Sequence, residues 1–159
     1  MLGGAATVAM KVVGLESKVR MVGLVGADLA AEELRDLLAA NPDVTDNLIA
    51  DSARATTVKT RFIAHNQQLL RVDREHRRVP TPKVSERLAA AAYAAAAEAD
   101  AVILEDYGKG VLSPQVITAA IEGAKRKGAP VVVDPTGRDY RRYAGTTVLT
   151  PNLKEASVA

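Results

Sequence analysis

Short apolar runs alternate with amphipathic stretches along the second half of the chain. Residues 101–104, 130–133 and 146–149 are short segments with β-branched side chains, and each one ends at polar residues. Runs of this kind are typical of strands buried on both faces of a parallel sheet. One helix is expected to begin at Pro82, before the first of these strands, and another at Pro114, after it, because proline suits the first helical position. The pattern therefore predicts an α/β fold.

The first half of the chain carries a different pattern. Residues 18–25 predict a strand, and Asp28 is the expected N-cap of the helix that follows. Residues 56–64 and 68–73 alternate in part between apolar and polar positions, which predicts an antiparallel hairpin with one charged face. A lone hairpin is marginal in water, so it should cover a site or pair with a partner. A solvated edge hairpin is the alternative that the pattern leaves open.

The domain organisation follows from length and from one proline-rich segment. The chain has 159 residues, of which 48% are hydrophobic, and this is enough to bury a core. We expect a single domain over residues 1–159. Residues 80–82 separate the hairpin at about 56–73 from a sheet-bearing half at about 80–159.

Composition excludes several classes of function. The chain has no cysteine, so a disulfide framework, a thiolate metal site and a cysteine nucleophile are ruled out. A net charge of +2 and an aromatic content of 3% argue against nucleic-acid binding. No apolar run is long enough to predict a membrane span, and we expect a cytoplasmic protein.

Polar side chains follow all three strands expected in the second half. Asp106 follows residues 101–104, while Asp134 and Asn152 follow the next two strands. Ligands of open parallel sheets bind outside the carboxyl ends of the strands, so these residues predict a site. Ordinary turn formers are the alternative explanation.

Gly3 and Gly4 add a second candidate site, since two glycines at a helix start let a ligand approach the backbone. A ragged chain start explains them equally well.

Six stretches in order along the chain resemble the ribokinase-like (PfkB-type) carbohydrate kinases. They are residues 3–6, 22–28, 66–73, 106–110, 134–137 and 150–155. Residues 66–73 and 106–110 resemble the branch that phosphorylates heptose 7-phosphate. The resemblance implies a ribokinase-like parallel-sheet α/β sandwich, here partial, with a small β lid hairpin over the sugar.

The function implied is ATP-dependent phosphorylation of a sugar phosphate. The branch implies heptose 7-phosphate, phosphorylated at its anomeric hydroxyl for lipopolysaccharide heptose precursors, with ATP and Mg²⁺ as cofactors and a homodimer formed through the lid. Two alternatives stay open. One is a kinase for another sugar or a nucleoside, and the other is a non-catalytic protein that binds sugar phosphate.

The resemblance also implies roles for individual residues. Arg71 and Lys59 are candidates for the phosphate already on the sugar. Asn152 and Glu155 match the Asn-x-x-Glu motif, whose carboxylate holds Mg²⁺ near the nucleotide phosphates. The full set expected to bind substrate is Gly3, Gly4, Lys59, Asn66, Gln67, Arg71, Asp106 and Lys109.

Three departures from the family pattern accompany the resemblance. Thr7 stands where the family's sugar-contacting asparagine is expected, and Thr136 stands where lysine is common in the heptose branch. The family's Gly-Ala-Gly-Asp segment, with its catalytic base, would lie beyond Ala159, and its first strands would precede Gly3. The resemblance therefore predicts a kinase domain truncated at both ends, with no catalytic base among these residues.

Overall fold

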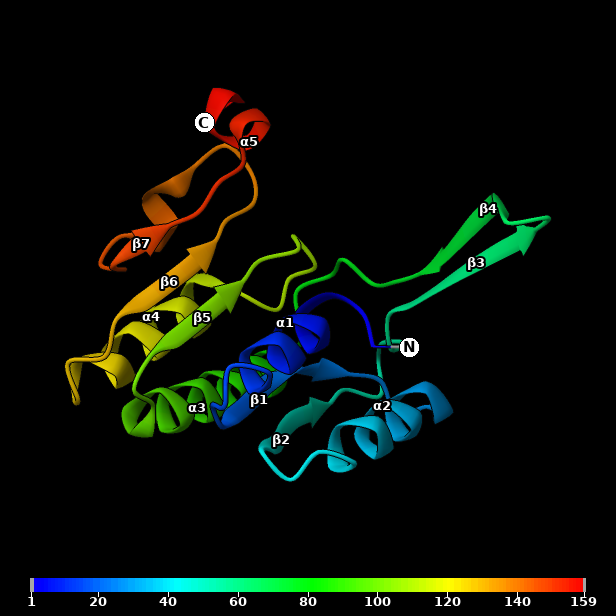
Figure 1. The fold of residues 1–159 in the computed structure, drawn as a ribbon. Helices are drawn as coiled ribbons and strands as arrows, with labels where there is room; N and C mark the ends of the chain where they lie inside the picture. The colour runs from blue at the N-terminus through cyan, green and yellow to red at the C-terminus, as the bar shows by residue number, and fades with distance from the viewer. Residues whose placement is uncertain (1, 159) are drawn as a thin grey trace. The chain divides into compact units, whose positions relative to one another are not determined.

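The computed structural model describes residues 2–158 and divides between His76 and Arg77 into two compact units (Figure 1). This division lies close to the segment, residues 80–82, that the sequence marks as a boundary. Each unit has its own parallel strands, and β3 and β4 form a separate two-stranded sheet. The α/β class predicted from the apolar pattern is confirmed.

The first unit combines a parallel strand pair with a hairpin. Its elements are α1 (Gly4–Val13), β1 (Val19–Val25), α2 (Leu29–Ala39), β2 (Val44–Ala50), β3 (Val58–Ala64) and β4 (Gln67–Arg74). β1 and β2 pair in parallel along their whole length. Their core is a cluster of small and aliphatic side chains, namely Ala6, Val25, Ala31, Leu38 and Leu48.

The hairpin β3–β4 is antiparallel, as the alternating pattern predicts. His65 and Asn66 form its two-residue turn with φ angles of 49° and 60°. Two central residues with positive φ are the signature of a type I′ turn, whose twist matches that of the flanking strands. Gln67, which lies just before the expected second stretch of residues 68–73, is the first residue of β4.

The second unit is built on a three-stranded parallel sheet in the order β5–β6–β7. Its elements are α3 (Pro82–Glu98), β5 (Val102–Glu105), α4 (Pro114–Lys125), β6 (Val131–Asp134), the 3₁₀ helix η1 (Tyr140–Tyr143), β7 (Val148–Leu149) and α5 (Leu153–Val158). Figure 1 shows β5 and β6 side by side with their arrowheads at the same edge. Leu88, Ile117 and Val133 are among its most deeply buried side chains.

Helices α3 and α4 are in close contact at Gly123. A Cβ atom at this position would lie 2.5 Å from the carbonyl oxygen of Tyr93, which is nearer than real Cβ contacts allow. The missing side chain therefore sets the distance between the two helices. None of the helices within residues 2–158 has the length and apolar character needed to cross a membrane.

The root of the hairpin is tied to the end of β1 by a buried hydroxyl group. Asp28 caps α2, as predicted, by accepting a hydrogen bond from the Ala31 amide at 3.1 Å. The same carboxylate accepts bonds from the Thr56 hydroxyl at 2.6 Å and the Thr56 amide at 3.0 Å. The Thr56 hydroxyl in turn accepts a bond from the Gly26 amide at 2.8 Å. The bond from the Thr56 hydroxyl is the main reason why the pKa of Asp28 is lowered.

We predict that Thr56→Val lowers the free energy of unfolding by about 2 kcal/mol, because the buried Gly26 amide and the Asp28 carboxylate would each lose a partner. Unfolding in urea measures the change. Thr57→Val is the matched control at an exposed neighbour and should stay within about 0.5 kcal/mol of the parent. Equal stability of the two variants would contradict the role given to the Thr56 hydroxyl.

Candidate functional site

The carboxyl ends of β5, β6 and β7 meet at one edge of the sheet in the second unit. Glu105 pairs with Asp134 in the parallel register, and the Thr150 amide donates to the carbonyl of Val133 at 2.9 Å. The Asp106 amide donates to the carbonyl of Asp134 at 3.0 Å, which extends the pairing by one residue. The polar residues that follow the three strands therefore share one edge, as the sequence predicts.

Asp106 organises the turn that follows β5. Its side chain is buried, and one carboxylate oxygen accepts a hydrogen bond from the Gly108 amide at 2.8 Å. The other oxygen accepts a bond from the Tyr143 hydroxyl at 2.7 Å and lies 3.5 Å from the Arg142 guanidinium. Both oxygens are thus engaged within the protein, so Asp106 shapes the loop whether or not it also touches a substrate.

Tyr143 is the most unexpected component of this edge. Its side chain is 1% exposed, and its hydroxyl accepts a hydrogen bond from the Thr136 amide at 3.2 Å while donating to Asp106. Burial, together with the bond to Asp106, raises the pKa of Tyr143 to about 12. The hydroxyl therefore stays protonated at neutral pH and remains a donor.

Lys109 lies between two glycines whose conformations build the loop. Gly108 and Gly110 have φ angles of 64° and 77°, which favour glycine. A Cβ atom on Gly110 would also lie 2.8 Å from the carbonyl oxygen of Arg78. Lys109 is thus carried by a tightly constrained loop at the carboxyl end of β5.

Asn152 and Glu155 form a reciprocal cap at the start of α5. The Glu155 carboxylate accepts a hydrogen bond from the backbone amide of Asn152 at 2.8 Å. The side-chain oxygen of Asn152 accepts one from the backbone amide of Glu155 at 3.0 Å. This is the geometry of a capping box. The cap holds the Glu155 carboxylate at the edge of the sheet.

The charge of Glu155 acts on a second carboxylate at this edge. Burial, followed by the negative charge of Glu155, raises the pKa of Asp134. Mg²⁺ typically binds proteins through one or two carboxylates together with phosphate oxygens and water, so these two residues could hold the ion that the resemblance implies. Within residues 2–158, however, no group of three or more acidic or histidine side chains forms a metal site by itself.

The predicted residues of the first unit lie at the start of α1 and on the hairpin. Gly3 is exposed, and a Cβ atom built there would meet no atom within 4 Å, while Gly4 has a φ of 50°. Asn66 and Gln67 are exposed at the tip of the hairpin. The Thr7 hydroxyl donates to the carbonyl of Leu2 at 3.1 Å, so it is engaged within the first turn.

Three cations of the hairpin, Lys59, Arg61 and Arg71, lie on one face. Lys59 and Arg71 both pair with Asp73, at 2.8 Å and 2.9 Å. The Lys59 hydrogen bond is the main reason why the pKa of Asp73 is lowered. Arg61 lies directly opposite Arg71 in the strand register, and like charges in that position destabilise a sheet unless an anion compensates them. Arg61 is therefore a candidate that we did not select from the sequence, although the alternating pattern could have found it.

The predicted site residues fall into two groups. Asp106 and Lys109 lie in the loop after β5, Asn152 lies in the loop after β7, and Glu155 lies in the first turn of α5. Gly3, Gly4, Lys59, Asn66, Gln67 and Arg71 belong to the first unit. Sequence reasoning missed Arg142 and Tyr143, because the segment from residue 138 to 145 has no periodicity that marks a helix.

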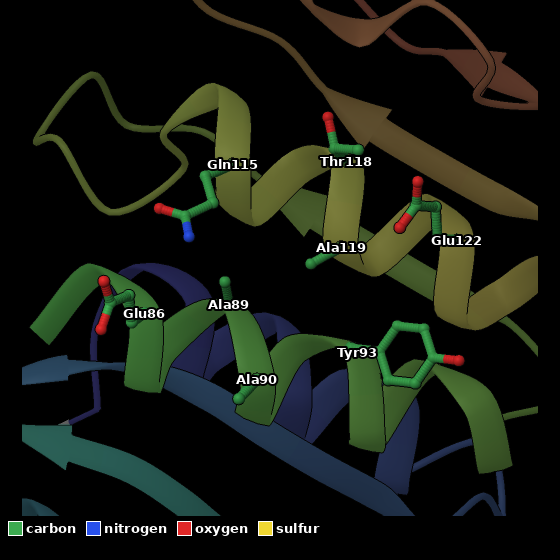
Figure 2. A pocket seen from close by; sticks show the side chains of 8 residues that line it. All are labelled: Glu86, Ala89, Ala90, Tyr93, Gln115, Thr118, Ala119 and Glu122. Carbon is green, nitrogen blue, oxygen red and sulfur yellow. The ribbon is translucent and has the colours of Figure 1, made fainter. Parts of the chain in front are cut away.

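A separate groove runs between α3 and α4 in the second unit. Figure 2 shows its floor of alanine side chains, with Glu86 and Glu122 beside it. None of the predicted site residues lines this groove. It is not the sugar or nucleotide site that the sequence predicts.

Comparisons with known proteins agree with these observations. The model of the pfkB family of carbohydrate kinases matches residues 1–159. The bifunctional protein HldE of Caulobacter vibrioides is 47% identical over the whole chain, which covers 32% of that protein. The bifunctional protein HldE of Gluconacetobacter diazotrophicus is 43% identical, again over the whole chain and 33% of that protein. The chain thus spans about a third of the length of these curated relatives.

Solved structures support the fold. The crystal structure of a possible 1-phosphofructokinase from Thermotoga maritima has a TM-score of 0.64 at 17% identity, covering 92% of this chain and 47% of that one. The ribokinase-like α/β fold expected from the resemblance is thereby confirmed. The family match and the fold lead to the same conclusion, which is that this chain belongs to the pfkB family of carbohydrate kinases.

Proposed function

We propose that the protein transfers the terminal phosphoryl group of ATP to a sugar phosphate, and that this substrate is heptose 7-phosphate, phosphorylated at its anomeric hydroxyl. The observation that carries the proposal is the identity of 40–47% to proteins named HldE across essentially the whole chain. The product would feed the synthesis of lipopolysaccharide heptose precursors. We place the reaction in the cytoplasm, where ATP is available.

The charged face of the hairpin suits a substrate that already carries a phosphate. Arg71 and Lys59 share a single carboxylate, Asp73, and Arg61 adds a further positive charge opposite Arg71. A guanidinium binds phosphate with two parallel hydrogen bonds, whereas an ammonium acts as a point charge. As a lid, this face would bring charge to the sugar phosphate and exclude water. Gly3, Gly4, Asn66 and Gln67 are proposed to contact the sugar.

The edge of the β5–β6–β7 sheet suits the nucleotide and its metal. Glu155, held by its cap with Asn152, and the neighbouring Asp134 would hold Mg²⁺, which neutralises charge on the phosphates. Lys109 is proposed to contact the sugar phosphate from the constrained loop after β5, with Asp106 shaping that loop.

The direct test measures ADP release by the 159-residue chain with Mg-ATP and heptose 7-phosphate. Ribose and fructose 6-phosphate form the comparison panel, and calorimetry measures binding of each sugar without ATP. Turnover with the heptose alone supports the proposal. Turnover with another sugar would overturn the substrate, and ATP-independent binding without turnover would favour a sugar-phosphate-binding protein.

We predict that Arg61→Ala and Arg71→Ala each weaken the affinity for heptose 7-phosphate at least tenfold, because each removes a charge-assisted contact of about 1.5–3 kcal/mol. Titration calorimetry measures the change. Arg87→Ala, on the exposed surface of α3, is the control and should bind like the parent. Unchanged affinity in both hairpin variants would remove the hairpin from the phosphate site.

We predict that Glu155→Gln raises the Mg²⁺ concentration needed for half-maximal ATP binding, measured by titration calorimetry, at least tenfold. Glutamine can still accept the bond from the Asn152 amide, so the cap persists while the negative charge is lost. Unfolding in urea should therefore change by less than about 0.5 kcal/mol. An unchanged magnesium dependence would contradict the metal role of Glu155.

We also propose that two copies associate through the hairpins. Phe62, Leu70 and Val72 lie on the hairpin face opposite the charged one and are each about half exposed (49%, 49% and 50%). A second copy would bury these side chains in a symmetric contact. Sedimentation equilibrium should show a dimer that Leu70→Lys dissociates, whereas a monomer at every concentration would refute this arrangement.

A further inference from the structure

Two loops leave the carboxyl edge of the second unit and must keep a fixed geometry for any ligand bound there. One follows β5 and carries Lys109, and the other is the turn of residues 134–137 that follows β6. Among residues 2–158, the backbone pairing that joins them lies at their start, in the bond from the Asp106 amide to the Asp134 carbonyl. Beyond that point the side chains must determine how the loops lie.

We infer that Tyr143 is a positioning residue, which locks these two loops together and so holds Lys109 in place for the sugar phosphate. The inference rests on the proposed function for the identity of the ligand, but not for the locking itself. The Tyr143 hydroxyl lies 2.7 Å from the Asp106 carboxylate of one loop and 3.2 Å from the Thr136 amide of the other. It uses its single donor toward the first loop and an acceptor site toward the second.

The lock is continued on both sides of the hydroxyl. The other oxygen of Asp106 accepts the bond from the Gly108 amide, one residue before Lys109. A Cβ atom on Gly108 would lie 3.5 Å from the Thr136 side chain, so the two loops also approach each other directly. A displacement of Tyr143 would therefore shift the backbone of Gly108 and, with it, that of the neighbouring Lys109.

Arg142 supplies the positive charge that balances the buried Asp106 carboxylate. Its guanidinium lies 5.3 Å from the centre of the Tyr143 ring and 3.5 Å from the Asp106 carboxylate, and it donates to the carbonyl of Leu112 at the end of the same loop. A buried carboxylate is costly unless a cation and hydrogen bonds compensate it. The pair Arg142–Tyr143 thus supplies both compensations from one turn of η1.

The same 3₁₀ helix provides a matched control. Tyr140 lies three residues earlier, and its hydroxyl is buried without a hydrogen-bond partner in the described part of the chain. Tyr140→Phe and Tyr143→Phe therefore each remove one buried hydroxyl from the same helix, although the Tyr143 residue as a whole is buried and Tyr140 is partly exposed. Only the second change breaks a link between the loops.

The test combines amide hydrogen exchange with calorimetry of heptose 7-phosphate binding, both on the full 159-residue chain. In Tyr143→Phe we expect the Thr136 and Gly108 amides to exchange at least tenfold faster and the affinity to fall at least fivefold. Core amides of α3 and α4 should exchange as in the parent. Tyr140→Phe should change none of these quantities.

Two results would overturn the inference. Unchanged exchange at Gly108 in Tyr143→Phe would show that the loops are not locked by the hydroxyl. Faster exchange with unchanged affinity would show that the lock is structural and does not position Lys109. Should Tyr143→Phe fail to fold, Arg142→Gln, whose side chain is 33% exposed, tests the lock by the same readouts.

A failure of the proposed function would look different. If the parent chain binds no heptose 7-phosphate, that function is wrong, and hydrogen exchange alone then decides whether Tyr143 locks the loops. The two conclusions are thus separated by the behaviour of the parent chain.

Discussion

The parallel hydrogen-bond register of β5, β6 and β7 is the constraint on which the second unit depends. Parallel pairing aligns the strands in one direction, so their carboxyl ends meet at one edge and the residues that follow them become neighbours. Glu105, Asp134 and Glu155 come from separate parts of the sequence, yet they influence the same region of space because of this register. The edge is acidic because the sheet brings these separate carboxylates together, and no single sequence motif contains all of them.

Much of this arrangement can be predicted from the sequence. The apolar runs locate β5, β6 and the hairpin, and Asp28 caps α2 because its residue type and position favour a cap. The pairing of β2 with β1 was not predicted, because residues 44–50 mix polar and apolar positions without a clear period. The 3₁₀ helix with Arg142 and Tyr143 could not be found either, since its two contacts with Asp106 join residues far apart in the sequence.

The candidate site shows the same contrast. Asn152 and Glu155 are recognisable because their interaction is local, spanning three residues. The opposition of Arg61 and Arg71 depends on a register that the irregularity after Phe62 shifts by one residue, so it needs the structure. Interactions between residues close in the sequence can therefore be predicted from it, whereas contacts between distant residues depend on how whole helices and strands pack.

The contact at Gly123 links helices α3 and α4 to the edge of the sheet that carries the candidate site. Helix α4 begins at Pro114, directly after the loop that carries Lys109, and it is held against α3 at Gly123 with no room for a methyl group. A close-packed helix moves as a rigid rod, so a spacer of one carbon atom at Gly123 would shift the anchor of that loop. The backbone of Tyr93 thus fixes the position of α4, and through α4 it fixes the position of the loop at the other end of the helix.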